Sequence, residues 1–552
     1  KIVEQYSGTP LDRILQQATE QERSETRLRD IVEAITRARD DDRIVRLVIV
    51  PTNMWRIGMA SLLEIEAAVA DFKTSGKPVI TLADNLSQQQ YYLAAFADEI
   101  WLHPKGIVWI DGFSAYRQFY REGLDKLEVE VNLFRVGEYK SAMEPFIRDD
   151  MSPEAKEANL YWIGSLWQQY LEGVSRNRGI PLDNLSEAIN DFANGLQAVD
   201  GDFAQFALKL GLVDRLVSRP EAHLALAGMG AAGSGSEGFR QIGIENYLAL
   251  TKMQHRPESK RKIAIVIAEG DIVRGAQPHG AVGAVTLSEE LRSAGEDSRV
   301  EAVVLRINSP GGDVFAAEKI RREVQALKES GKTVVVSMGD VAASGGYWIA
   351  MAADEVWASP STITGSIGVY GIIPTFSRPL EKLGIHSDGV GTTPLAGKLR
   401  LDRPLDSDLK RIFQHATEQT YDDFIRLVTD ARPLERHEVE AVARGRVWSG
   451  AQAKDRQLVD QIGNLQQAID AAARIAGLGS DYRVQYNERE MSRFESFLIE
   501  MTGSALLGFG VGQAGVPLLR STLLEDLLGD LYILARSAGK FSVVAHCLCR
   551  VD

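Results

Sequence analysis

Cysteine is nearly absent from this chain: of its 552 residues only Cys547 and Cys549 are cysteines. One intervening residue is poor geometry for a disulfide, and two sulfurs do not complete a zinc site. The chain also lacks a strongly apolar run of the roughly 18 residues that a membrane helix needs. The nearest, Met501–Leu519, is interrupted by glycines and polar residues, so we interpret it as a surface-seeking or interface segment.

Positive charge is in deficit, with a net charge of −14 at pH 7. Because phosphate binding wants a basic surface, we expect no nucleic-acid partner. The 45% apolar and 25% charged residues are typical of a globular protein, and the length fits two large domains. Since the sequence begins at Lys1 and not at methionine, we expect an upstream segment to precede it.

A strand, a turn of small residues and a helix follow one another around Ser344. Val334–Val336 is a β-branched run typical of a buried parallel strand, Ala342–Gly346 is small throughout, and Tyr347–Ala353 has helical spacing. This order places Ser344 at a helix N-terminus, where free N–H groups and the dipole favour a developing negative charge. Ser344 is the candidate nucleophile, although a lone Ser-Gly-Gly also fits an ordinary helix cap.

A second glycine-rich turn, Asn308–Gly312, follows the apolar run Val303–Ile307. Glycines after a strand let the backbone approach a ligand closely and point N–H groups at it. We therefore predict an oxyanion hole formed by the N–H groups of Gly312 and Gly345. The alternative is a structural type II turn.

The chain contains a long internal repeat. Residues Lys77–Trp101 resemble Lys332–Trp357, with Tyr91 aligned on Tyr347, a period of about 256 residues that indicates a duplicated domain. In each copy apolar runs alternate with amphipathic helices, which favours α/β units with largely parallel strands. We predict a first repeat at 1–226, a Gly/Ser-rich linker at 227–242, a second repeat at 243–480 and a helical tail at 481–552.

The two copies differ at the position of the candidate nucleophile and at the glycine-rich turn. Gln88 stands at the position of Ser344, and Asn53–Ile57 replaces the Asn308–Gly312 turn. The first copy therefore cannot host the same nucleophile. We predict one catalytic copy and one partner copy.

A hydroxyl nucleophile needs a base, and the residues alone do not identify it. A lysine can serve if burial lowers its pKa toward neutrality. The histidines after Ser344 have no flanking motif and are better explained as structural or surface residues: His386, His415, His437 and His546.

The chain resembles the long form of the signal peptide peptidase SppA family (protease IV). The motifs that support the resemblance are FRVGEYKSAMEPFIRDDMS at Phe134–Ser152, NSPGG at Asn308–Gly312, AASGGYW at Ala342–Trp348 and TGSIGVYG at Thr364–Gly371. The resemblance implies two tandem crotonase/Clp-like α/β repeats. It covers nearly the whole chain.

The resemblance also implies a Ser/Lys dyad. Lys140 corresponds to the family's general base, and Ser366 corresponds to the serine that orients the lysine amine. The second copy has Pro394 at the place that matches Lys140, so the dyad would join residues of both copies. Lys398, close to Pro394, remains a minor alternative base.

By the same resemblance, the substrates are cleaved signal peptides and other apolar extended peptides, and no metal or other cofactor is required. The implied assembly is a homotetramer. The implied location is the bacterial inner membrane, with the catalytic part on the periplasmic side and an N-terminal anchor that this sequence does not contain. Two alternatives stay open: a crotonase-like acyl-CoA hydratase or isomerase, which would not need Ser344, and a non-catalytic membrane-associated scaffold.

Overall fold

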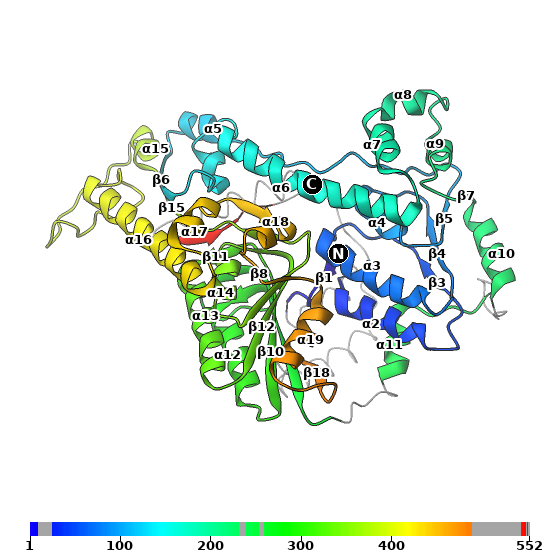
Figure 1. Cartoon of the computed structure of the whole chain (residues 1–552). Coiled ribbons are helices and arrows are strands. Elements are labelled where there is room, and N and C mark those ends of the chain that lie inside the picture. Colours follow the sequence, from blue (N-terminus) through cyan, green and yellow to red (C-terminus); the bar gives the residue numbers. More distant parts are fainter. Residues whose placement is uncertain (9–24, 231–238, 253–258, 488–541, 548, 550–552) are drawn as a thin grey trace, which may run out of the picture. The chain divides into compact units, whose positions relative to one another are not determined.

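A computed structural model describes the chain except for residues 9–24, 231–238, 253–258, 488–541, 548 and 550–552. The chain divides into two compact units (Figure 1). Unit 1 comprises Lys1–Tyr6, Arg23–Ser114 and Ile163–Lys260, and unit 2 comprises Ser7–Glu22, Ala115–Trp162 and Arg261–Asp552. Residues 115–162, which belong to the first copy by sequence, therefore pack with the second. The repeat boundaries at 226 and 243 stay a prediction.

Unit 1 is built on a four-stranded parallel sheet with the strand order β3-β4-β5-β7. Its strands are β3 (Leu47–Ile49), β4 (Val79–Ala83), β5 (Glu99–Leu102) and β7 (Arg215–Leu216), and a separate pair is β1 (Ile2–Val3) with β2 (Thr26–Arg27). Its helices are α2 (Leu28–Arg39), α3 (Met59–Lys73), α4 (Gln88–Ala94), most of α6 (Pro153–Arg178), α7 (Leu182–Asn190), α8 (Phe192–Gln197), α9 (Phe203–Lys209), α10 (Arg219–Met229) and α11 (Ile244–Lys252).

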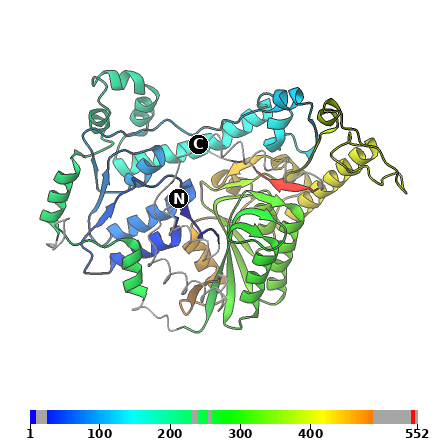
Figure 2. The same cartoon turned by 180° about the vertical axis from the view of Figure 1, so that it is seen from behind.

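Unit 2 contains a 13-stranded sheet whose main path is β16-β14-β12-β10-β8-β11-β19-β15-β6. Its long central strands are drawn in green in Figure 2. Its central strands β8 (Lys262–Val273), β10 (Val300–Ser309) and β12 (Thr333–Ala343) are parallel, as their apolar runs predicted. The other strands are β6 (Glu130–Val136), β9 (Gly280–Gly283), β11 (Gly311–Asp313), β13 (Glu355–Ala358), β14 (Ile363–Gly365), β15 (Val369–Thr375), β16 (Val447–Ser449), β17 (Gln461–Ile462), β18 (Arg483–Tyr486) and β19 (Val544–His546). The helices are α5 (Arg121–Lys126), the 3₁₀ helix η1 (Ser141–Phe146), α12 (Ala284–Glu296), α13 (Val314–Glu329), α14 (Gly345–Ala350), α15 (Ser377–Lys382), α16 (Ser407–Ala431), α17 (Arg436–Val442), α18 (Gly450–Asp455) and α19 (Leu465–Ile475).

The predicted duplication is confirmed by matching internal contacts in the two units. In unit 1 the Tyr91 hydroxyl donates to Leu212 O at 2.9 Å, and in unit 2 the Tyr347 hydroxyl donates to Leu458 O at 2.7 Å. Carboxylates repeat in the same way. Asp98 accepts from Val79 N and Asp354 accepts from Val334 N, both at 2.8 Å. The repeat therefore extends to polar contacts as well as to strands.

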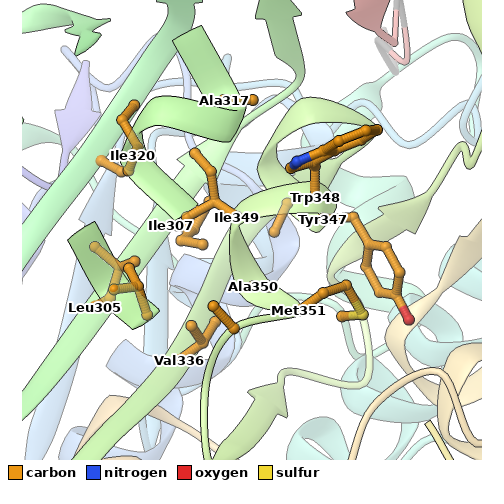
Figure 3. Close-up of a cluster of buried hydrophobic side chains, with 14 of the residues drawn as sticks. Leu305, Ile307, Ala317, Ile320, Val336, Tyr347, Trp348, Ile349, Ala350 and Met351 are labelled. Atoms are coloured by element: carbon orange, nitrogen blue, oxygen red, sulfur yellow. The ribbon is translucent and has the colours of Figure 1, made fainter. Parts of the chain in front are cut away.

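The short helix α14 is anchored by apolar side chains of its neighbours (Figure 3). Ile349 and Tyr347 are fully buried in a core cluster with residues of β10, β12 and α13, among them Leu305, Ile307, Ile320 and Val336. A helix this short is marginal by itself, so tertiary packing has to hold it. The core thereby fixes the backbone that begins at Ser344.

The last part of the chain contains a pair of cysteines and adds two strands to unit 2. The structure pairs Cys547 with Cys549, although a single intervening residue is poor geometry for a disulfide. The predicted tail contributes β18 and β19 to the sheet of unit 2. The apolar segment Met501–Leu519 lies outside the described residues. Among the helices that are described, none is long and apolar enough to cross a membrane.

We predict that shortening Ile349 destabilises unit 2. Ile349→Ala removes a fully buried side chain and should lower the free energy of unfolding by about 2–5 kcal/mol. Ile412→Ala is the matched control, because Ile412 also lies on a helix of unit 2 but is 45% exposed. Urea unfolding of both variants checks this, and equal losses would contradict the packing role of Ile349.

Candidate active site

Ser344 lies between the end of β12 and the start of α14. Its backbone has φ 55° and ψ −111°, a conformation that non-glycine residues rarely adopt. Such a residue stores about 1–3 kcal/mol of strain and persists where the surroundings fix it. Here Ser344 N donates to Gly365 O at 2.8 Å, and the buried helix follows directly. The side chain is consequently held in one place and has no exposed surface.

Lys140 is brought to Ser344 by the segment that packs with unit 2. β6 pairs antiparallel with β15 along its whole length, and Lys140 follows β6 at the start of η1. Its Nζ lies 2.8 Å from Ser344 Oγ. The same Nζ lies 3.0 Å from both the hydroxyl and the carbonyl oxygen of Ser366. The amine of Lys140 thus contacts both serines that the sequence analysis singled out.

Burial decides the charge of the lysine. Lys140 is 2% exposed, and desolvation lowers the pKa of its amine well below the ordinary value. The three oxygens around Nζ are hydroxyls and a carbonyl, none of them a carboxylate. A neutral amine has two N–H donors and one lone pair. The two donors suit the Ser366 oxygens, which leaves the lone pair for the Ser344 hydroxyl proton.

A loop that the sequence did not single out packs against the lysine. Tyr139 N donates to Arg444 O at 3.1 Å, and Ser366 N donates to Arg446 O at 2.7 Å. Gly445, between these two arginines, has φ 85°, and a Cβ there would lie 2.5 Å from Lys140 N. Only glycine fits this position. The glycine between two arginines after a helix is recognisable in the sequence as a turn. Nothing in the sequence indicates that this turn contacts Lys140.

The two predicted oxyanion donors lie on adjacent backbone. A Cβ on Gly345 would lie 3.1 Å from Gly312 N, and a Cβ on Gly311 would lie 2.6 Å from Gly345 N. Gly311 has φ 104°, and at Gly312 a Cβ would come within 2.0 Å of Ile272 O. The Asn308–Gly312 turn needs its glycines because strands pack tightly around it. Both N–H groups are buried, which suits stabilisation of a negative charge.

The alternative bases are placed elsewhere. Lys398 is partly exposed, and its Nζ pairs with Asp406 at 2.7 Å. The ring of His415 contacts Glu418, His437 contacts Glu435, and His386 is exposed. His546 Nε2 lies 3.2 Å from Asp271. None of these side chains shares a hydrogen bond with Ser344.

In unit 1 the counterpart of Ser344 is Gln88, whose side chain is hydrogen-bonded to the backbone. The side-chain oxygen of Gln88 accepts from Asp111 N at 3.2 Å and from Gly112 N at 2.8 Å. Gly112 aligns with Gly368, whose carbonyl lies 3.5 Å from Ser344 Oγ. Gln88 thus satisfies backbone groups where unit 2 keeps a hydroxyl. Among the described residues we find no group of three acidic, histidine or cysteine side chains able to hold a metal.

Comparison with known proteins shows the family. The model of peptidase family S49 matches residues 71–230 and 326–479, one segment in each copy, and that of Clp protease matches residues 263–362. Protease 4 of Salmonella typhi is 42% identical over 480 residues, which are 87% of this chain and 77% of that protein. The chain belongs to peptidase family S49. The resemblance inferred from the motifs is confirmed, and this S49 member is a serine peptidase.

Other relatives extend over similar lengths. Protease 4 of Haemophilus influenzae is 42% identical over 83% of this chain and 74% of its own length. The chloroplastic serine protease SPPA of Arabidopsis thaliana is 28% identical over 87% of this chain and 70% of its own length. ClpP1 of Listeria monocytogenes, a solved structure, matches 37% of this chain and 94% of its own at 19% identity, with a TM-score of 0.24.

We predict that Lys140 makes the stability of unit 2 depend on pH. The buried amine has a lowered pKa, so at pH values between this pKa and 10.5 the unfolded chain binds a proton that the folded chain does not. Stability should therefore rise with pH through this window, by up to about 1.4 kcal/mol per pH unit. Lys140→Met should flatten this part of the curve measured by urea unfolding.

Lys398→Met is the control for that measurement. Lys398 is partly exposed and paired with Asp406, so its loss should leave the slope between pH 7 and 10 close to that of the wild type. A wild-type curve without this slope, or one that Lys140→Met leaves unchanged, would show that the amine is not buried uncharged.

Proposed function

We propose that this S49 peptidase cleaves peptide bonds with a Ser344/Lys140 dyad, and that its substrates are signal peptides and other apolar, extended peptides. The observation that supports the dyad is the 2.8 Å contact between Lys140 Nζ and Ser344 Oγ in a buried setting without a carboxylate. The substrate class is carried over from relatives, one of which is described as a putative signal peptide peptidase of Enterococcus faecium.

The proposed reaction begins with proton transfer. Neutral Lys140 accepts the proton of the Ser344 hydroxyl as Oγ attacks the substrate carbonyl carbon. The N–H groups of Gly312 and Gly345 stabilise the oxyanion. Lys140 then gives the proton to the leaving amine, and water hydrolyses the ester. Ser366 holds Nζ in position throughout.

The alternatives fit the site less well. A hydratase or isomerase of the related fold would use carboxylates, but the groups next to Ser344 Oγ are an amine and a backbone carbonyl. A scaffold has no use for a strained serine or for a lysine buried at a cost in solvation. In unit 1 the corresponding place is filled by Gln88, as expected of a copy without catalytic activity.

We further propose a homotetramer that assembles head to tail. We align the two copies with their offset of about 256 residues. In this alignment α5 matches α15, β6 matches residues 386–392, and β15 matches residues 113–119. Within unit 2, β6 pairs with β15 over seven residues. Their counterparts form no strand in this chain. Residues 386–392 of one copy pairing with residues 113–119 of the next would repeat this contact, and such heterologous contacts can close into a ring.

The segment 383–399 has the surface that such a contact needs. It exposes several large apolar side chains, with exposed fractions of 39–105%: Leu383, Ile385, Val390, Leu395 and Leu399. Exposed apolar patches of this kind mark interaction sites. We also propose a location at the bacterial inner membrane with Ser344 on the periplasmic side. The likeness to bacterial Protease 4 supports the association with a membrane.

The first test is hydrolysis of an apolar peptide amide across pH. Ser344→Ala and Lys140→Met should each lose about 10⁴-fold or more in kcat, because dyad members act as a unit. Wild-type activity should rise as pH passes the lowered pKa of Lys140 and then reach a plateau. Lys398→Met should keep wild-type activity.

Ser366→Ala gives the graded result expected of a positioning residue. It removes one of the two Ser366 oxygens near Nζ and leaves the carbonyl contact. We expect a partial loss in kcat with little change in KM, together with a shifted acid limb of the pH profile. Full activity in Lys140→Met would contradict the proposed base.

The assembly is tested by sedimentation of Val390→Arg. A charge at this exposed position should break the proposed contact and reduce the mass from that of a tetramer to smaller species. Val45→Arg, at another exposed valine, should not. A tetramer that survives Val390→Arg together with Ile385→Arg would contradict the role of this segment.

A further inference from the structure

A segment of the chain itself, β19, fills the strand position between β11 and β15, here called the groove. β19 lies between β11, the strand of the oxyanion glycines, and β15, which follows Ser366 (Figure 1, red). It runs antiparallel to both. Adding an extended strand to exposed backbone edges is a general way in which proteins bind peptides. β19 is thus placed as a bound peptide would be.

The register of β19 puts Ala545 at the oxyanion donors. Gly312 lies opposite Ala545. On either side, Cys547 N donates to Pro310 O at 2.8 Å and Val314 N donates to Val543 O at 3.3 Å. Hydrogen-bonded pairs recur at every second residue of an antiparallel ladder. The Gly312 N–H therefore points toward the Ala545 carbonyl.

The Ala545 carbonyl is also next to the other donor. A Cβ on Gly345 would lie 3.0 Å from Ala545 O, and a Cβ on Gly311 would lie 2.1 Å from it. The same two positions border Gly312 N and Gly345 N. This oxygen therefore occupies the place where a scissile carbonyl oxygen belongs in acyl transfer.

Side-chain contacts hold the segment at both ends. The Ser542 hydroxyl donates to Asp313 at 2.6 Å, and His546 Nε2 lies 3.2 Å from Asp271. Between them, Ala545 is fully buried in the core cluster that includes β10 and α14. The segment is extended, and it is small and apolar at Ala545, the position next to the predicted oxyanion donors.

We propose that the chain cleaves its own Ala545–His546 peptide bond, an inference that rests on the proposed Ser/Lys chemistry. Ser344 Oγ bonds to the Ala545 carbonyl carbon while its proton passes to Lys140. The bond from Ala545 C to His546 N breaks, and Lys140 gives the proton to the released amine. Water then divides the ester into an Ala545 carboxylate and the Ser344 hydroxyl. While it is in place, the segment competes with other peptides.

The test is the intact mass of the full chain after incubation. The wild type should lose the segment from His546 to Asp552, and Ser344→Ala should keep it. A wild type that cleaves an added apolar peptide but keeps its full mass overturns the self-cleavage and leaves the proposed peptidase standing. A wild type that cleaves neither overturns the peptidase as well. Loss of the segment in Ser344→Ala also overturns self-cleavage, because another protease must then be responsible.

A variant of the segment tests its competition with added peptide. Ala545→Arg cannot be buried in the same way, so the segment should leave the groove, self-cleavage should stop, and KM for an added peptide should fall about tenfold because a tethered competitor is removed. Ala441→Arg, at an exposed alanine of α17, should change neither. An unchanged KM in a folded Ala545→Arg that is still cut after residue 545 would overturn the proposal. The mass comparison needs no variant of the segment, so it decides even if Ala545→Arg does not fold.

Discussion

The burial of one amine without a counter-charge is the constraint on which the site depends. A charged Lys140 would lose its hydration and find only hydroxyls and a carbonyl in exchange. Burial therefore favours loss of the proton by lowering the pKa of the amine, and a neutral amine next to a serine hydroxyl can act as a general base. The closely packed backbone of Gly445 and Gly368 around Lys140 keeps it this way. A substitution that admitted water to Lys140 would raise the pKa of its amine again, and a protonated amine cannot accept the proton of Ser344.

The same constraint gives a reason to keep a copy that has no nucleophile. Lys140 belongs by sequence to the first repeat, but residues 115–162 pack with the second, where β6 pairs with β15. The second repeat has Pro394 at the matching place and no such lysine. Unit 1 can therefore lack a nucleophile and oxyanion glycines, provided that residues 115–162 still bring the amine of Lys140 to Ser344.

Much of this could be predicted from sequence, because the patterns concerned are local. The parallel strands and the turns around Ser344 and Gly312 each follow from a few adjacent residues, and the repeat follows from comparing two stretches of the sequence. Lys140 could not be identified in this way, since its role depends on burial by Gly445, some 300 residues away in the chain. The family resemblance supplied it. The pairing of β19 with β11 had no local signal at all, and the lowered pKa of Lys140 follows only from its burial in the folded chain.

Preorganisation explains why the groove should hold a strand when no substrate is present. Gly312 and Gly345 present buried N–H groups, and buried donors without a partner are costly. Ser344 and Ser366 also sit on left-handed backbone, with φ of 55° and 51°, so the site cannot relax cheaply to hide those donors. An extended segment with a carbonyl at Ala545 satisfies them without any rearrangement. A site rigid enough to favour an oxyanion is thereby also a site that its own chain can occupy.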